Sequence, residues 1–438
     1  MKGFAQVTEA AEAAATGAVA RDEAPSVRLG RWWQLSLGVI CMVMIANLQY
    51  GWTLFVNPIH DKHGWSISAI QVAFSVFVVV ETWLVPFEGY LVDKIGPKLV
   101  GVVAGVLVAL AWVINSVADS LPMLYLGAIV GGIGAGAVYG ACVGNALKWF
   151  PDRRGLASGL TAMGFGAGSA LTVFPIANMI KSQGYEATFF KFGIGQGVVV
   201  FLVSWFLRAP DARTEASLPA ATNTGKFRLA TREFTPLETL RTPVFWLLYL
   251  MFTLTATGGL IMTAQLTPIA RDFAVAEAPV ALLGITLAAL PFALSMNRVL
   301  NGVSRPFFGW MSDHLGRERT MFLAFALESV FLLLLIPAGR SPVLFVILSG
   351  MVFFAYGEIY SLFPAICADV YGRTFAAANA GLLYTAKGVA ALLVPVASIV
   401  AATNVGWHAV FIVTAIMNLV AAALAGGVLA RLRERTIR

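Results

Sequence analysis

Twelve apolar segments follow one another along this 438-residue chain, and their length constrains the fold more than any other feature. A transmembrane helix needs about 20 predominantly apolar residues. Charged residues make up only 12% of the chain, whereas a soluble domain usually carries about 25%. The sequence therefore predicts an all-α membrane protein with twelve transmembrane helices. The predicted segments are 33–57, 67–91, 99–118, 122–147, 155–180, 188–207, 243–268, 279–311, 319–337, 341–366, 375–402 and 406–430.

One long polar stretch, residues 209–242, separates the first six segments from the last six. It contains five basic residues with Pro, Thr and Asn between them, which is typical of a linker. We expect two pseudo-symmetric six-helix halves, at 31–208 and 243–430. The Ala- and Glu-rich residues 1–30 are predicted to form a disordered tail, and residues 431–438 a basic tail.

The distribution of basic residues predicts how the chain is oriented, because cytoplasmic loops are enriched in Lys and Arg. With the N-terminus inside, 22 basic residues fall in inner loops and tails and 5 in outer loops. We therefore expect a multi-pass protein of the bacterial cytoplasmic (inner) membrane with both termini in the cytoplasm. This asymmetry explains the net charge of +7, so we expect a lipid bilayer rather than a nucleic acid as the partner.

Cysteine and histidine are too few and too scattered to form a catalytic or metal centre. The 3 cysteines lie in apolar surroundings without a CxxC pair, and the 4 histidines lie near segment ends without ligand-like spacing. We expect no metal, no cofactor and no enzymatic activity.

A motif of glycine, acid and base occurs twice, after segments two and eight, at an offset of 220 residues. A carboxylate at the cytoplasmic end of a helix can pair with bases or cap a neighbouring helix across the interface between halves. We therefore expect a conformational latch there. The spacing resembles the loop signature of the major facilitator superfamily, which implies that fold for the whole chain. The residues of the two copies are Gly89, Asp93, Lys94 and Gly96, and Gly309, Asp313, Gly316 and Arg317.

Ionisable residues inside membrane segments are costly and therefore mark functional sites. Arg305 and Lys387 have no acidic residue within a helical turn, which predicts a pocket completed by an anion such as a small dicarboxylate. The alternative is that these cations pair with glutamates of other helices. Arg298 lies on the same helical face as Arg305 and either faces the cavity or pairs with a glutamate. The ionisable residues assigned to the bilayer are Glu81, Glu88, Arg298, Arg305, Glu358 and Lys387.

The runs at 49–54, 149–159, 301–309 and 386–387 resemble the oxalate/formate antiporters of this superfamily. The resemblance implies that Arg305 and Lys387 are the cationic substrate ligands. Residues at which this chain departs from the family pattern are Phe165, in place of a tyrosine, and Tyr356 and Tyr384, in place of tryptophans. The remaining pocket residues that the resemblance implies are Gln49, Tyr50, Gln71, Tyr139 and Tyr360.

The function implied is exchange of oxalate for formate by alternating access, by a protein that acts as a monomer. The alternative is proton-coupled uptake of a monocarboxylate or another small organic acid, with Glu81 or Glu358 as the coupling acid. A different class of function is that of a membrane sensor, which has the transporter fold but signals instead of transporting. It would need a partner-binding element in residues 209–242, which contain no strong amphipathic helix.

Overall fold

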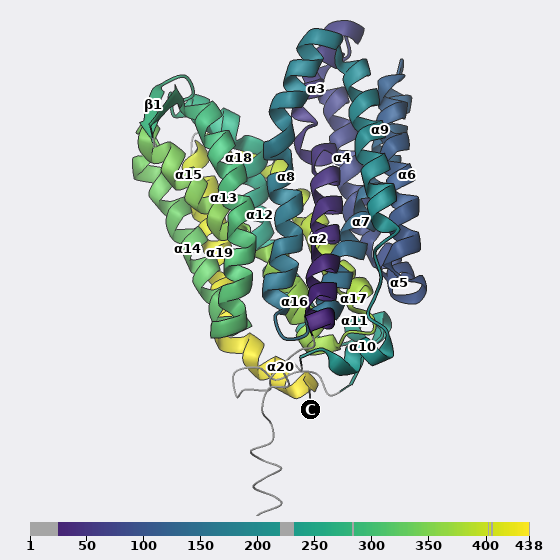
Figure 1. Cartoon of the computed structure of the whole chain (residues 1–438). Helices are drawn as coiled ribbons and strands as arrows, with labels where there is room; N and C mark the ends of the chain where they lie inside the picture. The colour runs from purple at the N-terminus through teal and green to yellow at the C-terminus, as the bar shows by residue number, and fades with distance from the viewer. Residues whose placement is uncertain (1–24, 220–231, 283, 402, 404–405, 438) are drawn as a thin grey trace, which may run out of the picture.

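The computed structural model describes residues 25–219, 232–282, 284–401, 403 and 406–437 (Figure 1). The first bundle contains α2 (Pro25–Tyr50), α3 (Thr53–His63), α4 (Ile67–Trp83), α5 (Val85–Ile95), α6 (Pro97–Ser116), α7 (Leu121–Trp149), α8 (Arg154–Gln183) and α9 (Tyr185–Ser204). The short helices α10 (Ala212–Ser217) and α11 (Pro236–Leu240) follow.

The second bundle begins with α12 (Pro243–Asp272), the antiparallel hairpin of β1 (Pro279–Leu282) and β2 (Ile285–Ala288), and α13 (Ala289–Leu315). It continues with α14 (Arg317–Ala338), α15 (Pro342–Tyr356), α16 (Ile359–Tyr371), α17 (Ala376–Ala391), α18 (Val394–Ala401) and α19 (Gly406–Leu424). A π-helical turn, η1 (Ala425–Leu429), leads into α20 (Ala430–Ile437).

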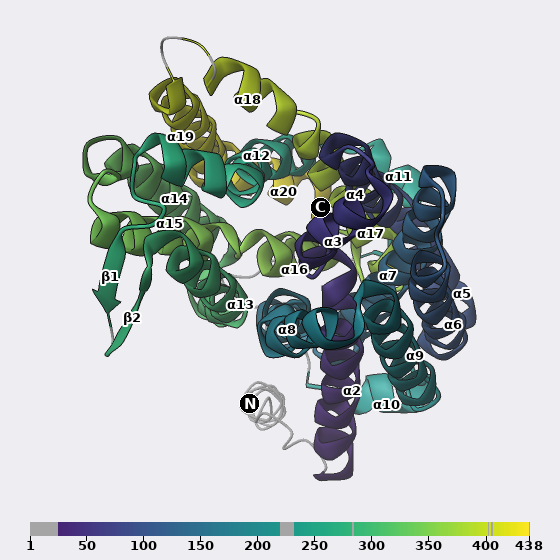
Figure 2. The same cartoon turned by 90° about the horizontal axis from the view of Figure 1, so that it is seen from above.

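The two bundles stand side by side, and α16 and α17 of the second extend against the first (Figures 1 and 2). The short helices α10, α11 and α20 lie at one end of the molecule, here called the linker end. The β-hairpin and α3 lie at the other, here called the hairpin end (Figure 1). Because α13 starts beside the hairpin, its early residues lie nearer the hairpin end and its last residues nearer the linker end.

Nine helical runs of the described chain are long and apolar enough to cross a membrane, and the pair α4–α5, bent by 42°, makes ten. The two remaining predicted segments are α13 and the pair α17–α18. Helix α13 is long but carries two arginines, and α17 is only 16 residues long. The structure is therefore consistent with twelve spans, and it explains why the two segments with the predicted cationic ligands look least like ordinary membrane helices.

Two predicted boundaries are wrong. Segment 279–311 starts with the β-hairpin, because Gly284 takes a positive φ of 77° between two short runs rich in residues that favour strands. Helix α2 begins at Pro25, inside the predicted tail 1–30, of which residues 1–24 lie outside the described part. The predicted basic tail is mostly helix α20, where Arg433 binds Glu318 at 2.5 Å.

Close packing between the bundles depends on small residues. Gly89 of α5 faces α17 so closely that an added Cβ would lie 2.5 Å from the carbonyl oxygen of Ala377. Gly159 of α8 meets the backbone of α13 at Arg305 in the same way. Since only glycine allows such backbone approach, these contacts hold α5 on α17 and α8 on α13. They thereby fix the helices that carry the central charged residues.

Candidate functional site

Lys387 of α17 is fully buried, and an acid of the other bundle faces its ammonium group. The Lys387 Nζ donates a hydrogen bond to the Tyr384 hydroxyl at 2.8 Å and lies 3.4 Å from Oε2 of Glu81 in α4. The Tyr384 hydroxyl donates to Glu81 Oε1 at 3.2 Å. Lys387 therefore follows the alternative interpretation, pairing with a glutamate of another helix. Sequence spacing reveals only partners on the same helix, so the sequence left open whether a glutamate or an external anion balances Lys387.

Arg305 of α13 is also fully buried, but neutral oxygens hold its guanidinium. Nη1 donates to the carbonyl oxygen of Ala162 in α8, and Nη2 donates to Asn301 Oδ1, each at 2.7 Å. Among the described residues, no carboxylate lies within 4.0 Å of Arg305, and its Nε has no hydrogen-bond partner. Gly166 makes room for this group, since an added Cβ would lie 2.9 Å from Arg305 Cζ. An anion can therefore still bind this cation.

Aromatic rings connect the two cations. The Tyr360 ring centroid lies 4.1 Å from Arg305 Cζ and 5.8 Å from Lys387 Nζ. Tyr384 stacks on Tyr139 at 4.5 Å and meets Tyr360 edge-on at 6.3 Å. Cations are attracted to aromatic faces, so Tyr360 keeps both positive charges in one region. Tyr139, Tyr360 and Tyr384, three of the five tyrosines that the sequence analysis singled out, therefore lie together beside these cations.

A cavity of ≈ 50 Å³ lies between α2, α8, α12, α13, α15 and α16. Arg305 does not line it, but Asn301 and Tyr360, which do, both contact Arg305. Tyr139 and Tyr384 line a separate cavity of ≈ 10 Å³. Gln71 lies in α4, but its side chain lies outside the part that the structure describes. The polar residues that line the larger cavity are Gln49, Tyr50, Thr263, Asn297, Arg298, Asn301, Tyr356 and Tyr360.

Several buried acids lie away from the two cations. The carboxyl oxygens of Glu88 in α5 and of Glu358 between α15 and α16 have no hydrogen-bond partner among the described residues. The same holds for Glu328 of α14, a fully buried residue that the sequence analysis did not include. Its position inside predicted segment 319–337 was enough to identify it from the sequence as an acid inside the membrane. The set of six intramembrane charges was therefore incomplete.

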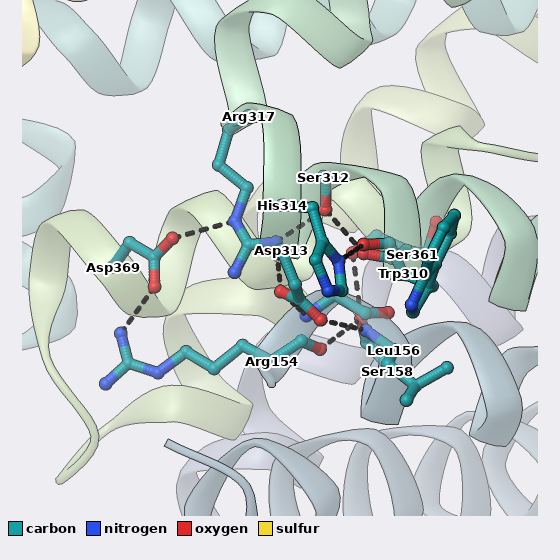
Figure 3. Close-up of polar contacts among 12 residues, drawn as sticks. Arg154, Leu156, Ser158, Trp310, Ser312, Asp313, His314, Arg317, Ser361 and Asp369 are labelled. Atoms are coloured by element: carbon teal, nitrogen blue, oxygen red, sulfur yellow. Dashed lines mark hydrogen bonds and ion pairs between the residues drawn. The ribbon is translucent and has the colours of Figure 1, made fainter. Parts of the chain in front are cut away.

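The second copy of the glycine–acid motif joins the bundles at the linker end (Figure 3). Asp313 accepts hydrogen bonds from the backbone nitrogens of Gly155, at 3.0 Å, and Leu156, at 2.8 Å, at the start of α8. Arg317 lies 2.6 Å from Asp313 Oδ1, and its Nε lies 2.8 Å from Asp369 of α16. Asp369 also pairs with Arg154 of α8 at 2.7 Å. Two carboxylates and two guanidinium groups therefore connect α8, α13, α14 and α16.

The first copy makes a simpler contact. Asp93 accepts from the backbone nitrogens of Ala377, at 3.4 Å, and Ala378, at 2.9 Å, at the start of α17, and it pairs with Lys148 at 2.7 Å. The Lys94 ammonium lies 5.3 Å from the ring centroid of Phe375.

Glycines shape both copies. Gly96 and Gly316 end their helices with φ values of 90° and 99°. Gly309, like Gly89, meets the backbone of the opposite bundle, in its case at Gly155. Each acid thus caps a helix of the other bundle, where a helix N-terminus favours negative charge.

The sequence analysis missed Lys148 as the partner of Asp93, and it missed Asp369, which pairs with Arg317 of the second copy and with Arg154. The neighbouring Arg153 is exposed and lies 3.5 Å from Asp152. Asp369 lay just outside predicted segment 341–366, although the apolar run continues to Tyr371. That single acid at the end of an apolar run was the available signal.

Two helical bundles that meet around buried charges, joined at one end by a repeated acidic motif, are typical of secondary membrane transporters. The profile of the Major Facilitator Superfamily matches residues 35–300 and 273–437. The chain belongs to this superfamily, and it is therefore a multi-pass membrane transporter and not an enzyme.

The oxalate:formate antiporter of Oxalobacter formigenes is 35% identical over 403 residues, which cover 92% of this chain and 92% of that protein. Monocarboxylate transporter 12-B of Danio rerio is 24% identical over 336 residues, covering 71% of this chain and 68% of that protein. The solved structure of the proton:xylose symporter XylE bound to 6-bromo-6-deoxy-D-glucose matches with a TM-score of 0.68 and 12% identity, covering 90% of this chain and 94% of that one. The predicted fold class and family resemblance are confirmed.

Proposed function

We propose that this transporter exchanges small carboxylates, with oxalate and formate as the leading pair. The observation that carries the proposal is Arg305, a fully buried guanidinium without a carboxylate within 4.0 Å in the described part of the chain, whose neighbours Asn301 and Tyr360 line a cavity of ≈ 50 Å³. Arginine binds a carboxylate through two parallel hydrogen bonds. The printed activity of the relative from Oxalobacter formigenes, an oxalate:formate antiporter, supports this choice of substrates.

In the proposed cycle, one carboxylate of oxalate binds Arg305 and the other binds Lys387 after displacing Glu81. Both cations lie against the Tyr360 ring, which supports a common ligand. A buried cation without a counter-ion is costly in a medium of low dielectric constant. The loaded carrier therefore changes conformation more readily than the empty one, and this preference produces exchange. Alternating access moves the two halves, 31–208 and 243–430, against each other.

The two acidic motif copies are proposed to act as the latch of this cycle. When the contacts of both copies are formed, the linker end of the molecule is closed. In the same proposal, the linker end faces the cytoplasm. In this proposal the protein lies in the bacterial cytoplasmic membrane and works as a monomer. The asymmetry of the basic residues, 22 against 5, supports this orientation.

Proton-coupled uptake of a monocarboxylate is the second candidate, and the Glu81–Lys387 pair favours it. Protonation of Glu81 would free the Lys387 ammonium for one substrate carboxylate, so a proton and an anion would bind together. The similarity to monocarboxylate transporter 12-B supports this reading less strongly than the antiporter supports exchange, because its identity and coverage are lower.

Purified protein in liposomes separates the two candidates. Labelled oxalate is added outside vesicles that contain either formate or no anion, with and without a pH gradient. Exchange predicts rapid uptake that requires internal formate and is unaffected by the gradient. Uptake that follows the proton gradient and ignores internal formate would reject exchange and support the second candidate. The Arg305→Ala protein serves as the control for uptake through the site.

A further inference from the structure

We propose that Arg298 forms a second carboxylate-binding subsite, on the hairpin side of Arg305, in which a small carboxylate is held on its way to or from Arg305. This inference rests on the proposed function. It assigns a role to the one arginine of α13 that the proposed cycle leaves unused.

Arg298 and Arg305 lie on one face of α13, seven residues apart, which corresponds to roughly 10 Å along the helix axis. Arg305 is fully buried, whereas Arg298 is partly exposed and nearer the hairpin end. An anion that enters from the hairpin end therefore reaches Arg298 first. Asn301, which accepts from Arg305 and lines the cavity, lies between the two arginines.

The cavity beside Arg298 carries buried polar groups without a protein partner. Both side-chain polar atoms of Asn297 and Oε1 of Gln49 are buried and make no hydrogen bond within the described part of the chain. Asn297 is 3% exposed, and both residues line the cavity together with Arg298. Such groups are usually satisfied in native proteins. The Asn297 amide and the Arg298 guanidinium supply the donors that a carboxylate requires.

The size and charge of the cavity fit a small anion. One water needs about 10–15 Å³ by the same kind of measure, so the cavity of ≈ 50 Å³ accommodates an anion of a few heavy atoms. In the described structure no carboxylate lies within 4.0 Å of Arg298, whose Cζ lies 5.2 Å from the centroid of the Tyr50 ring. Glu81 already balances Lys387. Of the three cations Arg298, Arg305 and Lys387, the two arginines therefore have no carboxylate partner in the described structure and can each bind an external anion.

The first test measures exchange kinetics. Arg298→Gln should raise the KM for oxalate and formate by about tenfold to a hundredfold, because one or two charged hydrogen bonds to the anion are lost. Its maximal rate should stay within about twofold of the rate of the unaltered protein. Arg298→Lys should keep KM within about threefold, because the charge remains. Arg271→Gln, at an exposed position of α12 outside the cavity, is the matched control and should leave KM unchanged. An unchanged KM in Arg298→Gln would overturn the subsite.

The second test measures binding without transport. Leu294→Cys, at a residue that lines the cavity beside Arg298, is treated with a thiol reagent; the natural cysteines Cys41, Cys142 and Cys367 are buried. Formate or oxalate should slow modification about tenfold at concentrations near tenfold above half-saturation, and this protection should be lost in the double variant Leu294→Cys with Arg298→Gln. Modification at the same rate with and without either anion would reject the subsite.

The two tests keep the two proposals apart. If the unaltered protein exchanges oxalate and formate but the Arg298 variants behave like the control, only the subsite is wrong. If the unaltered protein does not exchange these anions while they still protect the introduced cysteine, only the proposed function is wrong.

Discussion

Arg305 and Lys387 are both fully buried cations of the second bundle, yet the protein satisfies them differently. Lys387 faces a carboxylate, Glu81, whereas two neutral oxygens hold Arg305. The difference matters because a permanent counter-ion competes with a substrate and a neutral acceptor competes much less. Arg305 is therefore the position at which an incoming carboxylate meets an unbalanced charge. Lys387 becomes available only when Glu81 moves or is neutralised.

The largest expected effect is the loss of Arg305. Arg305→Ala should lower oxalate exchange in liposomes by at least about a hundredfold, because two charged hydrogen bonds to the substrate are lost. Arg305→Lys should recover only part of the rate, since a lysine cannot make the two-pronged contact. Exchange at the unaltered rate in Arg305→Ala would show that the substrate binds elsewhere.

The pairing of Lys387 with Glu81 can be tested through stability. Glu81→Leu leaves a buried ammonium without a counter-ion and should lower the free energy of unfolding by about 3–5 kcal/mol. The double variant Glu81→Leu with Lys387→Met should recover most of this loss. Thermal unfolding of the detergent-solubilised proteins measures both. Additive losses in the double variant would mean that the two groups do not interact.

Replacing Glu81 by an uncharged residue of the same shape tests whether Glu81 keeps Lys387, but not Arg305, from binding a substrate carboxylate. In Glu81→Gln no carboxylate competes for the Lys387 ammonium, so the affinity for oxalate should rise about tenfold. Formate, which needs only one cation, should gain less. Equilibrium binding of both labelled anions provides the measurement. An unchanged affinity for oxalate would remove Lys387 from the list of substrate ligands.

The smallest expected effect concerns the hydroxyl group that links Lys387 to Glu81. Tyr384→Phe removes a hydrogen bond on each side and should change the KM for oxalate by about threefold to tenfold. Tyr371→Phe is the matched control, because this buried tyrosine bonds Thr242 at 2.6 Å and lines neither cavity. Equal effects of the two substitutions would indicate a general packing defect instead of a specific role for Tyr384.

The central region and the linker end also differ in how well the sequence predicted them. The repeat identified Asp93 and Asp313, because a conserved spacing within one chain is visible without a structure. Lys148, which pairs with Asp93, and Asp369, which pairs with Arg317 and Arg154, come from other helices, so no local pattern indicates these pairings. In the centre, Arg305 and Lys387 stood out because a charge in an apolar segment is rare. The Glu81 partner lies 306 residues from Lys387 and was only one of several candidates.

The sequence by itself determined that this chain crosses a membrane many times, that it is built from a repeat, and that its chemistry lies with a few buried charges. These properties depend on hydropathy, local spacing and residue type, each of which is read along one segment. Only the tertiary structure decided which charges are balanced, because salt bridges and cavities form between helices whose relative positions no single segment encodes. It gave Lys387 a carboxylate and left Arg305 and Arg298 beside a cavity, and so concentrated the search for the substrate on α13.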